Sequence, residues 1–184
     1  MKPIRIPARS LLLLFALTAP ADPALARGGK AIDPNYLSII DCPDEPGCPA
    51  LVLLDETELS NASARARLSR RRLVKVFTNA GAVDHADVEV IETLGVEECR
   101  NLSGRTILPD GRTIPLKQEN IFVKPAYRKG GERLRVKAAK FPGVVPGVII
   151  EVSYDLIDPR ASNYVKWVWR IQGNLPVLKA HLTL

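Results

Sequence analysis

The 184-residue sequence is poor in the side chains that most often bind metals or attack substrates. It has two His, three Cys and one Met, and 5% of its residues are aromatic. It contains no run of about 18 or more apolar residues, which excludes a multi-pass membrane protein. The remaining composition, 46% hydrophobic and 25% charged, is typical of one soluble globular domain. Collagen, coiled coil and wholesale disorder are therefore excluded as well.

The first 26 residues have the three parts of a secretory signal peptide. Basic residues precede a short apolar core at Leu11–Leu17, and Ala24–Ala26 has the small-x-small pattern at which signal peptidase cuts. The apolar core is much shorter than the roughly 20 residues that a membrane-spanning helix needs. We therefore expect cleavage near Ala26. The mature chain would begin at Arg27, lack a transmembrane span and be periplasmic or extracellular.

Residues 27–50 contain many Pro and Gly breaks and are expected to form an extended leader. Within it, Cys42 and Cys48 bracket a turn, and export would permit a disulfide between them. Closing so short a loop would stabilise the fold by about 2 kcal/mol. A metal site at this pair is disfavoured, because neither His is near in sequence and the spacing is not C-x-x-C. Cys99 is left over and is expected to be a buried, poorly reactive thiol.

From residue 51 onward the hydrophobic residues recur with the two-residue period of β-strands. The clearest run is 148–156, and LPDG at 108–111 lies between two short alternating stretches, which predicts a hairpin. A helical turn is expected near 83–90. About nine or ten strands over 51–184 predict a single all-β domain, a two-sheet antiparallel β-sandwich. The side chains expected in its core are Leu53, Val74, Val76, Ile107, Val136, Val148, Ile150, Val152, Trp167, Trp169 and Leu182.

Six Lys or Arg residues fall within residues 65–75, on a strand expected at 65–77. One interpretation is an edge strand whose charges discourage pairing with another sheet. The other is a docking surface for an acidic partner, cell-envelope polyanions included, formed by Arg65, Arg67, Arg71 and Lys75, with Lys179 in the last strand. Nucleic acid is disfavoured as a partner, because the chain is exported and no aromatic residues interleave with the Arg run.

A cysteine hydrolase would need a Cys nucleophile next to a His that accepts its proton. The candidates are Cys99 with His85 or His181. Two Glu residues directly precede Cys99, and neighbouring carboxylates disfavour a thiolate. The sequence therefore predicts no catalytic residue and no enzyme activity.

An acidic run, Asp84, His85, Asp87 and Glu89, could surround a cation. Its two-residue steps fit the exposed edge of a strand better. No phosphate-binding loop is present either. We therefore expect no metal and no cofactor.

Four stretches in a fixed order carry a family resemblance: LVLLDE at 51–56, RRLVKVFTNAG at 71–81, RTILPDGR at 105–112 and FPGVVPGVIIEVSY at 141–154. Together they resemble a bacterial domain of unknown function that precedes a transglutaminase-like catalytic domain in exported proteins. The resemblance covers about residues 50–184 and implies an immunoglobulin-like β-sandwich without activity of its own. Cys42 and Cys48 are not part of the family pattern, and the catalytic domain is absent from this sequence.

The expected function is that of a non-catalytic exported module that packs on, or docks with, a transglutaminase-like hydrolase. The last strand, expected at 177–184, would lie at the docking end. The alternative is a stand-alone binding module for an anionic cell-envelope polymer or lipid.

Overall fold

The computed structural model describes residues 30–60, 65–158 and 173–184. Ala31–Leu184 forms one compact unit. Nine strands lie in the described residues: β1 (Ala50–Ser60), β2 (Ala66–Val76), β3 (Asp87–Thr93), β4 (Glu98–Ile107), β5 (Thr113–Pro115), β6 (Ile121–Lys129), β7 (Glu132–Lys140), β8 (Ile149–Asp158) and β9 (Ala180–Thr183). The described helical segments are α1 (Asn35–Ser38), α2 (Asn79–His85) and the 3-10 turn η3 (Gln118–Asn120).

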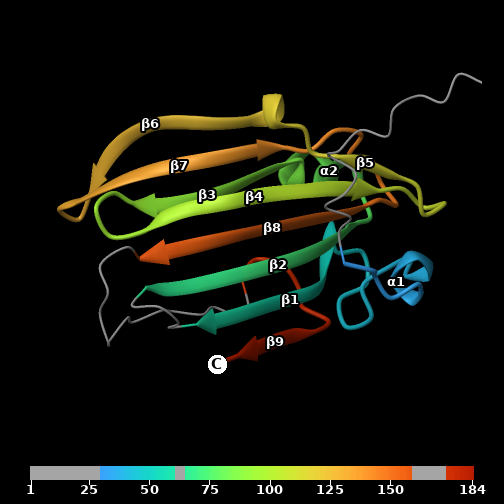
Figure 1. Ribbon diagram of the computed structural model, residues 1–184. Coiled ribbons are helices and arrows are strands. Elements are labelled where there is room, and N and C mark those ends of the chain that lie inside the picture. The colour runs from blue at the N-terminus through green and yellow to red at the C-terminus, as the bar shows by residue number, and fades with distance from the viewer. Residues whose placement is uncertain (1–29, 61–64, 159–172) are drawn as a thin grey trace, which may run out of the picture. The chain divides into compact units, whose positions relative to one another are not determined.

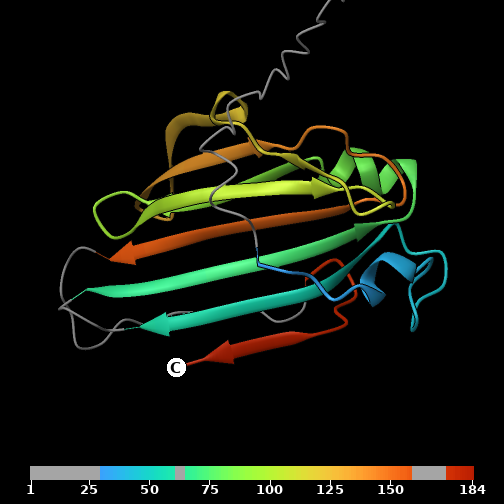
Figure 2. The same cartoon turned by 45° about the vertical axis from the view of Figure 1, so that its right-hand side comes forward.

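The strands form two sheets, which confirms the predicted all-β sandwich. The six-stranded sheet has the order β5-β4-β8-β2-β1-β9, and the three-stranded sheet has the order β3-β7-β6. Figures 1 and 2 show β3, β7 and β6 on one side, next to β4, with β9 at the opposite edge. Pairing between these strands is antiparallel, except that β9 runs parallel to β1.

One apolar cluster joins the two sheets. Ala139 of β7 packs with Phe141 and with Val148, Ile150 and Val152 in and beside β8. Most of the predicted core residues are buried, namely Leu53, Val74, Val76, Ile107, Val136, Val148, Ile150 and Val152. Leu182 is half-buried, and Trp167 and Trp169 lie outside the described residues.

A second apolar cluster covers the other face of the six-stranded sheet. Tyr36 and Leu37 of α1 pack against Leu54, Leu73 and Ile149, next to the buried pair of cysteines. Figures 1 and 2 show α1 beside the start of β1. Residues 31–48 thus pack on the sheet and contribute to its core.

The interpretation of the Arg-rich segment as an edge strand is wrong. β2 pairs with β1 on one side and with β8 on the other, over nearly its whole length. The edges of the two sheets are instead β5, β9, β3 and β6. An interior position for so many cations requires carboxylates on both neighbouring strands, and β1 and β8 provide them.

The local turn predictions are confirmed in part. The LPDG hairpin is present, with Ile107 opposite Thr113 and Gly111 at φ 85°. The helix lies earlier than expected, at 79–85 rather than near 83–90, because the Oγ1 of Thr78 accepts a hydrogen bond from the N–H of Gly81 at 3.0 Å and caps it. None of the described helices is both long and apolar enough to cross a membrane.

Candidate docking surfaces and charged clusters

The strand β8 places two carboxylates on the face of the sheet that was predicted to be polar. Glu151 accepts hydrogen bonds from Arg71 at 2.6 Å and from Arg105 at 2.5 Å. Arg71 also reaches Glu56 of β1 at 3.1 Å. Glu151 is buried, so its charge is held by two guanidinium groups rather than by water.

Asp155, four residues further along β8, has its own set of donors. Both of its oxygens lie 2.9 Å from Arg67 Nη2, while Ser69 and Asn101 donate at 2.7 Å and 2.6 Å. Burial opposes ionisation of Asp155, but the hydrogen bonds outweigh it and lower the pKa of this carboxyl. The ionised form of Asp155 is therefore the one that the fold stabilises.

This pKa shift predicts an acid-dependent loss of stability. Because the folded-state pKa of Asp155 lies below the unfolded value of about 3.9, its contribution is complete above that pH and disappears as the pH falls through the folded value. Asp155→Asn should therefore lower the free energy of unfolding at pH 7 more than at pH 3. Urea titrations at both pH values measure it; an equal loss at the two would contradict the ionised role of Asp155.

The opposite face of β2 carries a third cluster around Asp55. Arg70 donates to both oxygens of Asp55, at 2.8 Å from Nε and 2.5 Å from Nη2, and Arg72 Nε lies 3.8 Å away. Asp55 is fully buried. The Arg run is therefore largely a source of internal ion pairs across the interior of the sheet.

The residues predicted as a docking surface consequently fall into three groups. Arg71 and Lys75 are engaged inside the fold, since Lys75 is buried and donates to the carbonyl of Leu37 at 3.2 Å. Arg67 is half-exposed but bound to a carboxylate. Arg65 and Lys179 are exposed. The carboxylate partners were not identified from the sequence, because only the pairing register of β2 with β1 and β8 brings them opposite the Arg residues.

Cys99 lies in a fourth charged cluster, between β4 and β3. Its backbone N–H donates to Glu92 at 2.8 Å, and its carbonyl accepts from Lys137. Arg135 holds the second oxygen of Glu92 at 2.6 Å. Burial raises the pKa of the Cys99 thiol to about 11, which keeps it protonated at neutral pH.

Neither histidine of the sequence lies next to Cys99. His181 is on β9, four strand spacings from β4 in the same sheet, or about 19 Å. His85 ends α2, whereas Glu92, which touches Cys99, is five residues into β3, or about 16 Å along that strand. The described residues therefore bring no Cys–His pair together.

The predicted disulfide joins Cys42 and Cys48, and both cysteines are buried against the sheet. Cys99 is free and buried. A thiol titration in denaturant, of protein purified from an oxidising compartment, should thus find one reactive thiol before reduction and three after it. Under native conditions Cys99 should be alkylated slowly, because its thiol is buried and protonated. Three free thiols before reduction would contradict the bridge.

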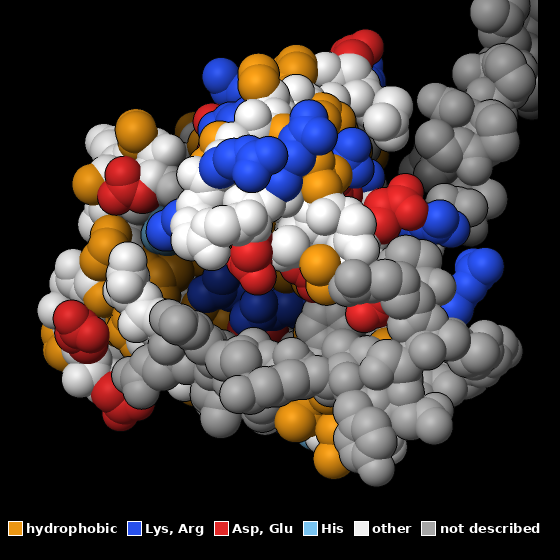
Figure 3. Space-filling model, turned by 90° about the vertical axis from the view of Figure 1, so that its left-hand side faces the viewer, with side chains coloured by type: hydrophobic (Ala, Val, Ile, Leu, Met, Phe, Trp, Pro, Cys, Tyr) orange, Lys and Arg blue, Asp and Glu red, His pale blue; other side chains and the backbone are white. Residues whose placement is uncertain are grey.

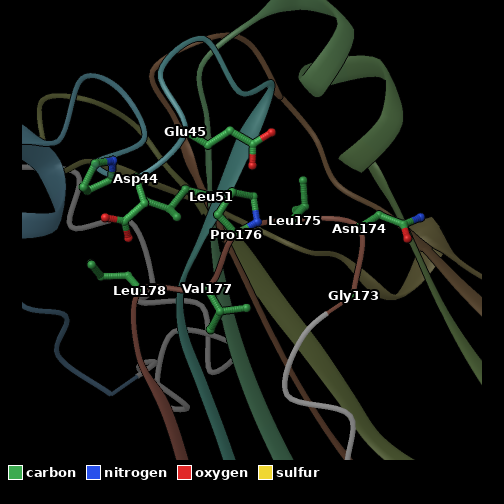
Figure 4. Close-up of a pocket in the computed structure, with 10 residues that line it drawn as sticks. Asp44, Glu45, Leu51, Gly173, Asn174, Leu175, Pro176, Val177 and Leu178 are labelled. Atoms are coloured by element: carbon green, nitrogen blue, oxygen red, sulfur yellow. The ribbon is translucent and has the colours of Figure 1, made fainter.

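A cavity of about 260 Å³ lies between the disulfide loop and the segment that leads into β9. It is lined by Pro43, Asp44, Glu45, Leu51 and Gly173–Leu178. Figure 4 shows Asp44 at the left of it, Glu45 above its centre and Asn174 at the right. The lining residues include neither Cys nor His, so the cavity offers polar contacts but no nucleophile–base pair.

The acidic run that could have surrounded a cation is divided between two elements. Asp84 and His85 belong to α2, while Asp87 and Glu89 belong to β3, an edge strand. Glu89 pairs with Lys124. Among the residues that the structure describes, no group of three or more His, Cys, Asp or Glu side chains could hold a metal ion.

Comparisons with known proteins match this arrangement of strands. Residues 62–184 match the family model described as Domain of Unknown Function with solved-structure structure (DUF3857). The fold is also similar to a crystal structure described as a "putative protease" from Parabacteroides distasonis ATCC 8503, with a TM-score of 0.59 and 14% identity. That match covers 70% of this chain and 27% of the other, so the present chain spans about a quarter of its length. No curated protein sequence matches.

Proposed function

Since the chain belongs to the DUF3857 family, we propose that it is an exported, non-catalytic β-sandwich module that packs on, or docks with, a transglutaminase-like hydrolase. The observation that carries the proposal is how small a part of the matched protein this fold accounts for. The matched region makes up 27% of a longer chain, so most of that chain lies outside it. A module of this kind supplies a surface rather than a reaction.

The surroundings of the ionisable groups support a non-catalytic role. Cys99, the candidate nucleophile, is buried, has a raised pKa and has no histidine beside it. The buried carboxylates Asp55, Glu92 and Glu151 are each engaged by one or two Arg side chains. Groups paired in this way hold neighbouring strands together, because separating a buried ion pair leaves an uncompensated charge.

The position of β9 at the edge of its sheet supports a docking site near the C-terminal residue. β9 pairs on one side with β1 and stands at the end of the sheet order, so its other side pairs with no strand in the part of the chain that the structure describes. Leu178, Lys179 and Leu184 are exposed beside it. An edge with backbone donors, apolar side chains and one cation suits a protein partner.

The test is capture from envelope extract, with the captured protein identified by mass spectrometry. The wild-type chain should retain a protein with a transglutaminase-like Cys/His/Asp domain. Lys179→Glu should abolish its capture and Arg65→Glu should not; both variants reverse one exposed charge. Arg71→Glu is unsuitable as the control, because Arg71 is bound to Glu56 and Glu151.

Two results would overturn the proposal. Loss of capture with Arg65→Glu but not with Lys179→Glu would move the docking site away from β9. Hydrolytic activity of the purified chain that Cys99→Ser abolishes would show that the module is itself an enzyme.

A further inference from the structure

The Asp55 cluster contains one more guanidinium group than its carboxylate can hold. Arg70 binds both oxygens of Asp55, one from Nε and the other from Nη2. Arg72 lies beside the same carboxylate, with its Nε 3.8 Å from Oδ2, and this buried Nε has no hydrogen-bond partner. Among the described residues, Asp55 is the only carboxylate that forms an ion pair with either guanidinium. Two cations therefore share one anion, which leaves a surplus of one positive charge.

The segments outside the described residues contain no carboxylate that would balance this surplus. Within residues 27–184, every Asp and Glu lies in the part that the structure describes. Burial and the neighbouring charge of Arg70 lower the pKa of Arg72, and the charge of Asp55 offsets them only in part. A largely buried cation without a counterion is unfavourable, so the site favours an anion from outside the chain.

A buried hydroxyl next to Arg72 also lacks a partner. Thr57 is 3% exposed, and its Oγ1 forms no hydrogen bond with any described residue. In the register of β1 and β2, Asp55 lies opposite Arg72 and Thr57 lies opposite Arg70. Thr57 and Arg72 are therefore diagonal neighbours on one face, a separation that a long side chain spans. A hydroxyl donor and a guanidinium fork on one surface suit an anion with oxygen atoms.

The site lies on the face of the six-stranded sheet that carries the three-stranded sheet. Arg72 is opposite Val152 of β8, and Val152 packs with Ala139 of β7 in the cluster that joins the sheets. The side chains of Arg70 and Arg72 are 25% and 35% exposed, so a small group from solvent can reach them. Figure 3 shows a hollow with Lys and Arg side chains at its base, at the end of the molecule where β2 begins and β8 ends.

We propose that this site binds a carboxylate group from outside the chain. The Arg72 guanidinium would donate hydrogen bonds to its oxygens, and the Thr57 hydroxyl would donate to one of them. One surplus charge favours a monoanion, because a phosphate dianion would leave a negative charge uncompensated. A water molecule would accept hydrogen bonds from both groups but would not neutralise the charge. The inference goes beyond docking at β9, and its test needs no protein partner.

The experiment follows the backbone amide NMR signals of β1 and β2 during titration with sodium acetate, at an ionic strength held constant with sodium chloride. Acetate should shift these signals to saturation. Arg72→Gln should weaken acetate binding about ten-fold or more, the loss expected when a charged hydrogen-bond donor is removed. The matched control, Arg65→Gln, removes one exposed cation and should change acetate binding less than about two-fold.

Two further titrants identify the ligand. Phosphate at pH 8, where it is a dianion, should bind more weakly than acetate. A terminally blocked pentapeptide with one central Glu carries the same carboxylate on a polypeptide. Tighter binding of this peptide than of acetate would assign the site to a protein side chain, whereas binding of acetate alone would assign it to a small carboxylic acid.

Thr57→Val separates a ligand site from a purely structural role. Valine keeps the shape of threonine but lacks the hydroxyl. In chloride alone, this variant should resist urea at least as well as wild type, because a buried polar group without a partner has been removed. It should nevertheless bind acetate about five-fold more weakly. Arg72→Lys, which keeps the charge without the fork, should bind acetate with intermediate strength and preserves the test if Arg72→Gln unfolds.

Four results would overturn the inference. The first is the absence of a saturable shift with acetate. The second is a loss of acetate binding in Arg65→Gln as large as that in Arg72→Gln. The third is tighter binding of phosphate than of acetate. The fourth is a Thr57→Val variant that is less stable in chloride yet binds acetate like wild type, which would show that the hydroxyl serves the fold alone.

Discussion

Replacing Glu151 with alanine should lower the free energy of unfolding by about 3–5 kcal/mol. Glu151 is 4% exposed in its side chain and accepts hydrogen bonds from Arg71 and Arg105. Without its carboxylate, two largely buried guanidinium groups lose the anion that they share. The attraction between such groups is strong because little water screens it, and the cost of leaving a charge in that environment is correspondingly large.

The matched control is Glu98→Ala in β4. Glu98 pairs with Arg100 at 2.8 Å, and both side chains are about half-exposed. An exposed pair contributes about 0–1 kcal/mol, so this variant should unfold close to wild type. Urea denaturation with an unchanged m-value measures both variants. Similar losses in the two would show that Glu151 is not held in a low-dielectric environment.

The position of Glu151 shows what could be predicted from the sequence. The alternation of residues 148–156 correctly separates Ile150 and Val152 from Glu151 and Asp155. The alternation does not reveal that the face of Glu151 and Asp155 is covered as well. Residues 31–48 cover one end of that face, and guanidinium groups cover the rest. Periodicity reports which residues share a face, whereas burial of that face depends on distant segments.

The Arg-rich strand shows a limit of a different kind. A run of cations is compatible with an edge, a docking surface or an interior strand with carboxylates on both sides. The choice depends on register, because Asp55 and Glu56 meet Arg72 and Arg71 only when β1 pairs with β2 as observed. Loop length and single-chain composition do not fix such pairings, and neither predicts the parallel contact of β9 with β1.

The ion pairs of the β6–β7 hairpin were equally hidden in the sequence. Lys124 pairs with Glu89 and Arg135 pairs with Glu92, both across β3. Only the arrangement in space separates these two cations from Arg128 and Arg133, which form no ion pair with residues 30–60, 65–158 or 173–184.

Removing the ring of Phe141 should cost about 3–5 kcal/mol of unfolding free energy, the range usual for a buried aromatic residue. Phe141 is 3% exposed and belongs to the cluster that joins both sheets. Its ring also covers Gly104 of β4, since a Cβ at Gly104 would lie 2.7 Å from ring atoms Cε1 and Cζ. Phe141→Ala would therefore leave a cavity between the sheets and uncover the backbone of β4.

The control for this variant is Phe122→Ala, which removes an identical ring from a side chain that is 52% exposed. Its loss should be about 1 kcal/mol or less, because much of its ring is already in water. Phe141→Leu should give an intermediate loss, since it restores part of the apolar volume over Gly104. Equal losses for Phe141→Ala and Phe122→Ala would place both rings in comparable surroundings. That result would contradict both the apolar contact between the sheets and the exposed position of Phe122.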